Sequence, residues 1–397
     1  MNVPKLRFKE FNDEWRQINL KETFIYLSTN SLSREQLSDK GILKNLHYGD
    51  IHRKYNSIVN ENDDITTYVK DLNYINKYEK IKENDLIFAD ASEDYDGIGK
   101  AVEVINIKND TISGLHTILA REKEKIFAPM FKGYYFNSYI IHNQIRVLAN
   151  GFKVYGISKD SINKLNVKIP TINEQKKIAN TLNLLDKKIE LQSRKIEDLK
   201  LFKKGLHDKL FNEVTGNDYL LSDIAVFENG KGHENIVDEN GKYILINSKF
   251  ISTEGNVIKK CSEQLTPLFK NDITMVMSDL PNGKALAKCY YIDENNKYSL
   301  NQRICKIKVK DDSIINSKYL FYLLNRNSYY LRFDDGVNQT NLKKDDILSL
   351  NLVLPSIKEQ ERDSKTLTII DNFIEKENNK LSKLFLLKKG LMQSMFV

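Results

Sequence analysis

The chain has 397 residues, of which 41% are hydrophobic and 29% are charged, and its formal net charge is +7. This length suggests two or three domains, and the hydrophobic content excludes a chain that is disordered throughout. The positive charge permits a polyanionic partner, while three dispersed cysteines exclude a disulfide framework or a zinc ribbon and favour a reducing compartment.

The N-terminal segment MNVPKLRFKEFNDEW is charged and holds no apolar core, so we expect no signal peptide. No run of 18 apolar residues occurs along the sequence, which predicts no membrane span. We therefore expect a cytoplasmic protein that does not enter a membrane.

The residues up to Pro170 predict a first α+β domain. Short apolar runs bounded by Asn, Asp and Gly predict strands at 85–89 and 101–105, and a further strand at 167–169 ends at Pro170. The turns between these strands mix basic, amide and aromatic side chains.

A long helix is predicted to follow, from about residue 173 to 211. Thr171 stands three residues before Glu174, which is the spacing of a capping box. Apolar residues then recur at the 3–4 spacing of a coiled-coil seam over about five heptads. These seam residues are Ile178, Leu182, Leu185, Ile189, Ile196, Leu199 and Leu206. The alternative is that the helix simply covers its own sheet.

The second half of the chain repeats this plan. Residues 347–396 match 162–211 without a gap at an offset of 185, set by Pro170 and Pro355, and strands are predicted at 243–246 and 273–277 with a helix at 317–324. The second seam comprises Leu367, Ile370, Ile374, Leu381, Leu384 and Leu391. The matching is weaker upstream, where the first copy holds about 16 more residues than the second.

The duplication predicts the architecture. We expect an α+β fold in which two similar α/β domains are separated by two long helices that form an antiparallel coiled coil, in an internal pseudo-twofold repeat. Polar residues at seam positions, such as Lys203 and Lys388, would set the register of the pair.

Signatures of catalysis are absent from the sequence. There is no phosphate-binding loop, no Asn-Pro-Pro-aromatic loop of amino-methyltransferases, no strand-linked G-x-G-x-x-G and no G-x-S-x-G. The six histidines are dispersed, which predicts no metal site. The sequence therefore favours a non-catalytic protein without a cofactor of its own.

The predicted turns that mix basic, amide and aromatic side chains favour binding to double-stranded DNA. Arg and Lys can read guanine, Asn and Gln can read adenine, and Lys, Ser and Tyr can contact phosphates. Solvated loops without a ligand are the alternative for each residue. The candidate DNA-binding residues are Tyr48, His52, Arg53, Lys54, Tyr55, Tyr95, Lys100, His116, Lys231, Lys249, Lys284, Asn301, Gln302, Arg303, Asn338 and Gln339.

These features together resemble the specificity subunits of Type I restriction-modification systems. The resemblance rests on the opening VPKLRFKEFNDEW, on PTINEQKKI and PSIKEQER at the two helix starts, and on the repeated KKGL near each helix end. It covers essentially the whole chain. It implies a first target-recognition domain at 1–170, a spacer helix at 171–213, a second target-recognition domain at 214–355 and a second spacer helix at 356–397.

The resemblance also implies the function and the partners. Each domain would read one half of a bipartite, asymmetric DNA site, and the paired helices would set the gap and dock two methyltransferase (M) subunits. Restriction (R) subunits would join the complex, and S-adenosylmethionine, ATP and Mg would act in these partners. A coiled-coil scaffold that does not read DNA is the alternative, and a self-sufficient nuclease or methyltransferase is a third.

Overall fold

The computed structural model describes residues 3–75, 78–151 and 154–397, and the chain divides into two units. Unit 1 comprises residues 1–194 and 378–397, and unit 2 comprises residues 195–377. Both units combine sheets with helices, so the predicted α+β class is confirmed. The chain leaves unit 1 within the first long helix, α7 (Ile172–Asn212), and returns to it within the second, α13 (Ile357–Ser394).

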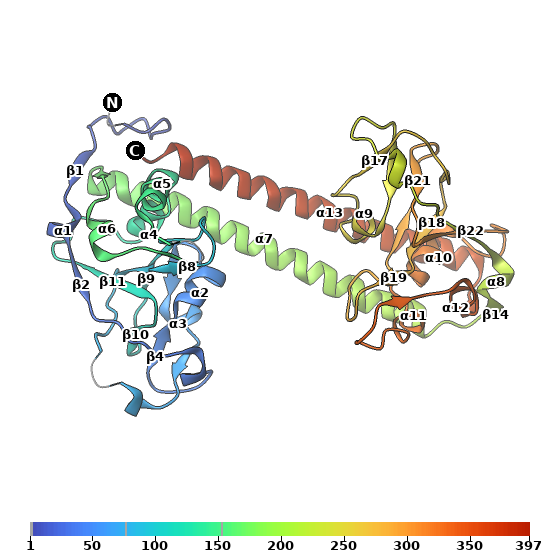
Figure 1. Ribbon diagram of the computed structural model, residues 1–397, viewed down its shortest axis with the longest axis horizontal. Helices are drawn as coiled ribbons and strands as arrows, with labels where there is room; N and C mark the ends of the chain where they lie inside the picture. Colours follow the sequence, from blue (N-terminus) through green and yellow to red (C-terminus); the bar gives the residue numbers. More distant parts are fainter. Residues whose placement is uncertain (1–2, 76–77, 152–153) are drawn as a thin grey trace. The chain divides into compact units, whose positions relative to one another are not determined.

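Unit 1 is built around a five-stranded sheet in which a single pair, β5 with β9, is parallel (Figure 1). A second sheet of four strands lies against one of its faces through the core that contains Ile51, Val59 and Ile87. The main sheet has the order β2 (Phe24–Leu27), β11 (Thr117–Glu122), β7 (Leu86–Ala89), β9 (Ala101–Ile105) and β5 (Ile58–Asn60), and the second has the order β10 (Thr111–Ser113), β4 (Lys44–Leu46), β6 (Tyr68–Val69) and β3 (Leu37–Ser38).

Short elements complete unit 1. Two further strand pairs are antiparallel: β1 (Arg16–Ile18) with β13 (Val167–Ile169), and β8 (Ala91–Ser92) with β12 (Tyr155–Gly156). The helices are α1 (Leu20–Thr23), α2 (Tyr48–Arg53), α3 (Glu61–Asp64), α4 (Phe131–Phe136), α5 (Tyr139–Leu148) and α6 (Lys159–Asn163), with 3-10 turns at Arg34–Gln36 and Leu72–Tyr74.

Unit 2 repeats this plan with fewer elements. Its main sheet has the order β15 (Ala225–Asn229), β22 (Ile304–Val309), β18 (Ile273–Val276) and β20 (Cys289–Tyr291), and its second sheet has the order β17 (Lys260–Cys261), β16 (Tyr243–Ile246) and β21 (Tyr298–Leu300). The paired short strands are β14 (Asn217–Leu220) with β24 (Asn351–Leu354), and β19 (Ser278–Asp279) with β23 (Thr340–Asn341). The helices are α8 (Leu221–Ile224), α9 (Ser248–Ser252), α10 (Ser317–Leu324), α11 (Ser328–Leu331) and α12 (Lys344–Leu348), with a 3-10 turn at Glu234–Ile236. β5 and α3 of unit 1, with 3 and 4 residues, have no counterpart here and account for part of the extra residues predicted in the first copy.

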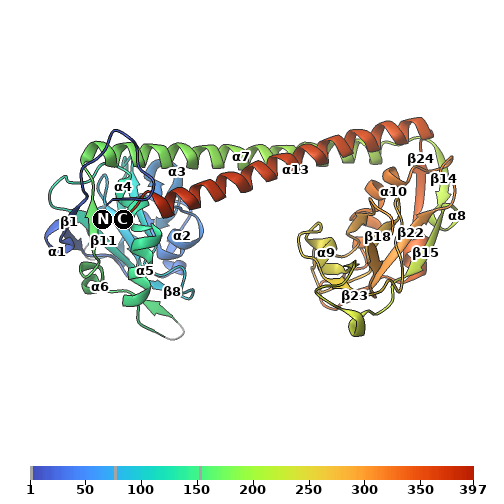
Figure 2. The ribbon, with the colours of Figure 1, turned by 90° about the horizontal axis from the view of Figure 1, so that it is seen from above.

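The two long helices run antiparallel in each unit (Figure 2). In unit 1, Lys388 of α13 forms a 2.5 Å ion pair with Asp186 of α7, and in unit 2, Lys203 of α7 forms a 2.5 Å ion pair with Asp371 of α13. These two pairs are related by the repeat offset, so each unit holds its own copy of one interhelical contact. The predicted seam residues are all buried or half-buried, and Ile178 and Leu182 among them pack into the core of unit 1. The ion pairs between the helices confirm that α7 and α13 also pair with each other, as the coiled coil predicts.

A buried glutamine fixes each long helix to the domain before it. Gln175 accepts a 2.9 Å hydrogen bond from the Ala128 N–H and donates to the carbonyls of Ile126 and Pro170. Gln360 makes the same three bonds, accepting from the Asn316 N–H at 2.9 Å and donating to two carbonyls. Because a buried amide needs its hydrogen bonds, these residues orient the first turn of each helix.

The predicted capping boxes form at one helix only. Glu359 accepts hydrogen bonds from both the N–H and the hydroxyl of Ser356, as the spacing predicts. At the first helix the expectation is wrong, because both carboxylate oxygens of Glu174 accept hydrogen bonds from Arg7 at 2.8 Å. A bidentate guanidinium contact is stronger than a neutral capping bond, so Arg7 displaces Thr171 as the partner.

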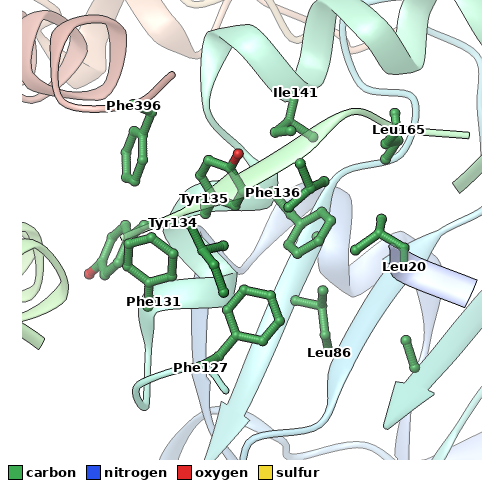
Figure 3. Close-up of a cluster of buried hydrophobic side chains, with 14 of the residues drawn as sticks. Leu20, Leu86, Phe127, Phe131, Tyr134, Tyr135, Phe136, Ile141, Leu165 and Phe396 are labelled. Carbon is green, nitrogen blue, oxygen red and sulfur yellow. The ribbon is translucent and has the colours of Figure 1, made fainter. Parts of the chain in front are cut away.

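The end of the chain belongs to the core of unit 1 (Figure 3). Phe396, just beyond α13, is 3% exposed, and its ring lies 6.0 Å from that of Phe131 and 5.5 Å from that of Tyr135. The Tyr135 hydroxyl donates to the carbonyl of Val397 at 3.3 Å, and the Leu6 N–H donates to the carbonyl of Ser394 at 2.9 Å. The first and last segments of the chain therefore close the same domain.

Candidate nucleic-acid interface

In unit 2, several predicted site residues meet at one end of the main sheet. A cavity of about 410 Å³ opens where β15, β18 and β22 meet their loops. Its lining comprises Asn229, Gly230, Met277, Ser278, Gln302, Arg303, Asn341 and Leu342. Its polar side chains are amides, a hydroxyl and a guanidinium, all of which can hydrogen-bond to the edge of a base, and Met277 and Leu342 add apolar surface.

Arg303 is the most exceptional residue of this cavity. Its φ angle is 67°, a left-handed conformation that few residues with a bulky side chain adopt, and its carbonyl accepts a 3.1 Å hydrogen bond from the Met277 N–H. Its side chain is exposed, and within the part of the chain that the structure describes no hydrogen bond or ion pair involves its guanidinium. Most other arginines hold a carboxylate or a carbonyl, as Arg121 does with Asp85. The Arg303 guanidinium is therefore free to bind a ligand.

Other predicted residues surround this cavity. Asn301 is half-buried, and its Oδ1 atom has no hydrogen-bond partner among the described residues. Gln302 donates to the carboxylate of Glu234, and Gln339 donates to the Ser278 hydroxyl at 2.7 Å. The structure thus brings Asn301, Gln302, Arg303 and Gln339 together, as a shared role requires.

The remaining candidates of unit 2 lie outside the cavity lining. Lys231, Lys249 and Lys284 are exposed, on the loop after β15, on α9 and on the loop before β20, where lysines suit phosphate contacts. Asn338 donates from its backbone and its side chain to Asp335, and these hydrogen bonds lower the pKa of the Asp335 carboxyl to about 2.

In unit 1, three predicted residues form an aromatic cluster at the start of α2. The Tyr48 ring lies 5.2 Å from His116 and 6.1 Å from His52, both edge to face. The His116 Nδ1 atom lies 3.2 Å from the Asp90 carboxylate, and the His52 Nε2 atom lies 2.9 Å from the Ala91 carbonyl oxygen. His116 is exposed, whereas Tyr48 and His52 are half-buried. Aromatic rings beside polar groups suit contact with bases and sugars.

Two further candidates of unit 1 have structural contacts. Tyr55 is 6% exposed in the core, and its hydroxyl donates to the carbonyl of Asp64, so it offers no surface to a ligand. Lys100 is half-buried, and its Nζ donates to the carbonyl of His52 at 3.2 Å, closing the end of α2.

The other three are more accessible. Lys54 forms a 3.3 Å ion pair with Asp50, and Arg53 is exposed. Tyr95 is 43% exposed, although its hydroxyl donates to the Arg146 carbonyl.

Lys100 also lines a second cavity, of about 440 Å³, that the sequence analysis missed. Its lining comprises Asn56, Ser57, Asp96, Lys100, Asn137, His142, Arg146, Lys388 and Met392. Burial and the nearby Lys388 charge lower the pKa of Lys100, and burial lowers that of His142, with the Arg146 charge adding to the effect. The surplus of basic groups favours an anion. No local signal could have revealed this cavity, since its residues come from distant segments.

The outer surface of each helix pair carries large apolar side chains. In unit 2 these are Leu201, Phe202, Ile369 and Phe373, and in unit 1 they are Leu184, Leu191, Leu386 and Leu387; we call each set of four a helix patch. Leu201 and Phe202 are 68% and 61% exposed. Counting heptads from Leu182 and Leu367 places every member at a c, f or g position, and these positions form one stripe along the outer side of each helix, away from the a/d seam. Each patch flanks one interhelical ion pair.

Within the described residues, no three His, Cys, Asp or Glu side chains gather as a metal site would require. None of the described helices, α7 and α13 included, combines the length and the hydropathy that crossing a bilayer demands.

The chain is similar to known proteins along nearly its whole length. The family described as "Type I restriction modification DNA specificity domain" matches residues 12–201 and again residues 216–385. The Type I restriction enzyme MjaVIII specificity subunit of Methanocaldococcus jannaschii is 22% identical over 347 residues, which cover 80% of this chain and 79% of that protein.

Two solved structures share the fold. The S subunit of a Type I restriction-modification system from M. genitalium has a TM-score of 0.62 at 16% identity, with 100% of this chain and 99% of that chain covered. A chain from a structure of complex assembly and conformational transition of the type I R-M system has a TM-score of 0.60 at 13% identity, with 97% and 98% covered.

Proposed function

The chain belongs to the family of Type I restriction-modification DNA specificity subunits, and from this we propose that each of its two domains reads one half of a bipartite, asymmetric DNA site. The observation that carries this proposal is that the family's DNA specificity domain occurs twice, on one fold, with different side chains at the loops. One fold with two sets of polar groups suits two different base sequences. A scaffold that does not read DNA leaves the two DNA specificity domains without a role.

We expect a domain exchange to change one half of the site only. Residues 1–165 are replaced by the corresponding segment of a family member with a different target, and methylated positions are sequenced in cells that carry the M subunits. One half-site should change and the other should stay, because the bases are read by two separate domains. The reciprocal exchange, of residues 214–350, is the matched control and should change the other half-site. A change in both halves, or in neither, contradicts the proposal.

The paired helices would set the gap between the half-sites. Helix α7 has 41 residues, which corresponds to about 60 Å at 1.5 Å per residue. A polar contact at the seam joins the exposed Lys195 to the buried Glu377 at 3.2 Å and holds the two helices in one register. A rigid pair of this length suits a spacer.

Lengthening both helices by one heptad should lengthen the gap. Seven residues are inserted after Ser193 and seven after Asn378, so that both interhelical ion pairs and the seam survive. The added rise of about 10 Å equals about three base pairs of B-DNA. Methylome sequencing should show a longer gap between unchanged half-sites. An active complex that keeps the old gap contradicts the spacer role, and seven residues inserted after Asn240, in an exposed turn, should leave the gap as it is.

The helix patches would dock two methyltransferase subunits, one on each unit. Exposed apolar stripes of this kind are typical of surfaces that bind a partner helix. The partners would supply the catalysis: S-adenosylmethionine with adenine methylation from the M subunits, and ATP and Mg with DNA cleavage from restriction (R) subunits.

A further inference from the structure

One backbone position in each domain carries an unusual residue. His116 directly precedes β11 in unit 1, and Arg303 directly precedes β22 in unit 2. Both have left-handed φ angles, 54° and 67°. The His116 carbonyl accepts a 3.0 Å hydrogen bond from Asp90, the first residue after β7, and the Arg303 carbonyl accepts a 3.1 Å bond from Met277, the first residue after β18. The two residues therefore occupy the same place in the repeated fold.

Arginine is uncommon in this backbone conformation, whereas histidine, like asparagine, adopts it more often than most residues with a Cβ atom. A left-handed φ is strained for a side chain with a Cβ atom and is easiest for glycine, with asparagine next. Residues with a strained backbone conformation occur most often at functional sites, where the side chain has a role that a glycine could not fill. The position also lies at the sheet end where unit 2 has its amide-lined cavity.

In one tautomer of His116, the two side chains present opposite hydrogen-bonding groups. The Arg303 guanidinium can only donate, and it has no partner among the described residues. His116 lies beside the Asp90 carboxylate, and a neutral imidazole that donates its Nδ1–H to that carboxylate presents Nε2 as an acceptor. Guanine offers two acceptors in the major groove, O6 and N7, whereas adenine and cytosine each offer an exocyclic amine donor.

We propose that this position is a specificity determinant in both domains, with Arg303 reading a guanine in the half-site of unit 2 and His116 accepting from an adenine or cytosine amine in the half-site of unit 1. This inference rests on the proposed reading of one half-site by each domain. It places a hydrogen-bond acceptor in unit 1 and a donor in unit 2 at equivalent positions of the repeated fold. Two domains with one fold would thereby recognise two different half-sites.

The test is Arg303→Asn in the complete complex with its M subunits, followed by sequencing of methylated sites. Asparagine tolerates a left-handed φ, so the substitution keeps the backbone while removing the bidentate donor. We expect the preference for guanine at one base pair of one half-site to fall roughly tenfold or more. Arg16→Gln is the matched control, since Arg16 is an exposed arginine of the short strand β1 in unit 1 and belongs to neither of the two loops that carry His116 and Arg303, so it should leave the site unchanged.

His116→Asn is the independent second arm and should relax one base pair in the other half-site. If the Arg303→Asn variant fails to assemble, the methylated sites of the His116→Asn variant test the inference alone. Unchanged half-sites in an active Arg303→Asn complex, or a change in the half-site that the domain exchange assigns to unit 1, overturn the inference. A wild-type complex that methylates no bipartite site would instead refute the proposed function.

Discussion

Phe396→Ala should lower the free energy of unfolding of unit 1 by about 3–5 kcal/mol, although Phe396 is the penultimate residue of the chain. Terminal residues are ordinarily disordered and tolerant of change. This one is 3% exposed and packs between Phe131 and Tyr135, so its removal leaves a cavity in the largest core of the unit.

Chemical denaturation of the full chain, followed by a probe in unit 1, measures this effect. Phe385→Ala is the matched control, because Phe385 lies on α13, shortly before Phe396, but is 53% exposed, and its removal should cost little stability. Equal stability of the Phe396→Ala variant and the wild type would show that the end of the chain adds nothing to the core.

Replacing Leu201 and Phe202 together by Glu should remove one of the two methyltransferase subunits that we propose for the complex. Burying two large apolar side chains contributes about 3–6 kcal/mol to binding, so the affinity should fall about 100-fold or more at the helix patch of unit 2. Two new carboxylates at a buried contact would weaken it further.

Measuring the mass of the assembled complex separates this site from its copy in unit 1. The wild type should bind two M subunits and the variant one, since Leu386 and Leu387 of the other helix patch stay intact. Ile42→Glu with Val147→Glu is the matched control, because both residues are 83% exposed and lie outside the patches. Retention of both subunits by the Leu201 and Phe202 variant would exclude this surface from docking.

The sequence predicts the elements that depend on local pattern. The seams, the strands at β7, β9, β16 and β18 and the helix α10 all follow from spacing within one segment, and the repeat supplies the architecture. The Asp186–Lys388 and Asp371–Lys203 ion pairs are only partly predicted. The sequence identifies the two lysines as polar residues at seam positions, but it does not show which carboxylates they contact.

Contacts between distant segments could not be predicted. Arg7 bonds Glu174 across more than 160 residues, and this contact overrides the local capping signal. Tyr55 and Arg303 both lie in polar loops of similar composition. The Tyr55 side chain is nevertheless buried, with its hydroxyl donating to the Asp64 carbonyl, whereas the Arg303 side chain is exposed. Loop composition identifies which turns are polar, but burial and the φ angle decide which side chains face a ligand.

The closing of unit 1 by Phe396 has a consequence for how the protein is made. Ribosomes add about 5–20 residues per second, so the last residues follow β13 by roughly 10 to 45 seconds. Throughout that interval the nascent first domain exposes the faces of Phe131 and Tyr135 that Phe396 later covers. A chain whose translation stops early would keep that apolar surface uncovered, where chaperones and proteases act. The packing of Phe396 thus makes synthesis as far as this residue a condition for a finished first domain.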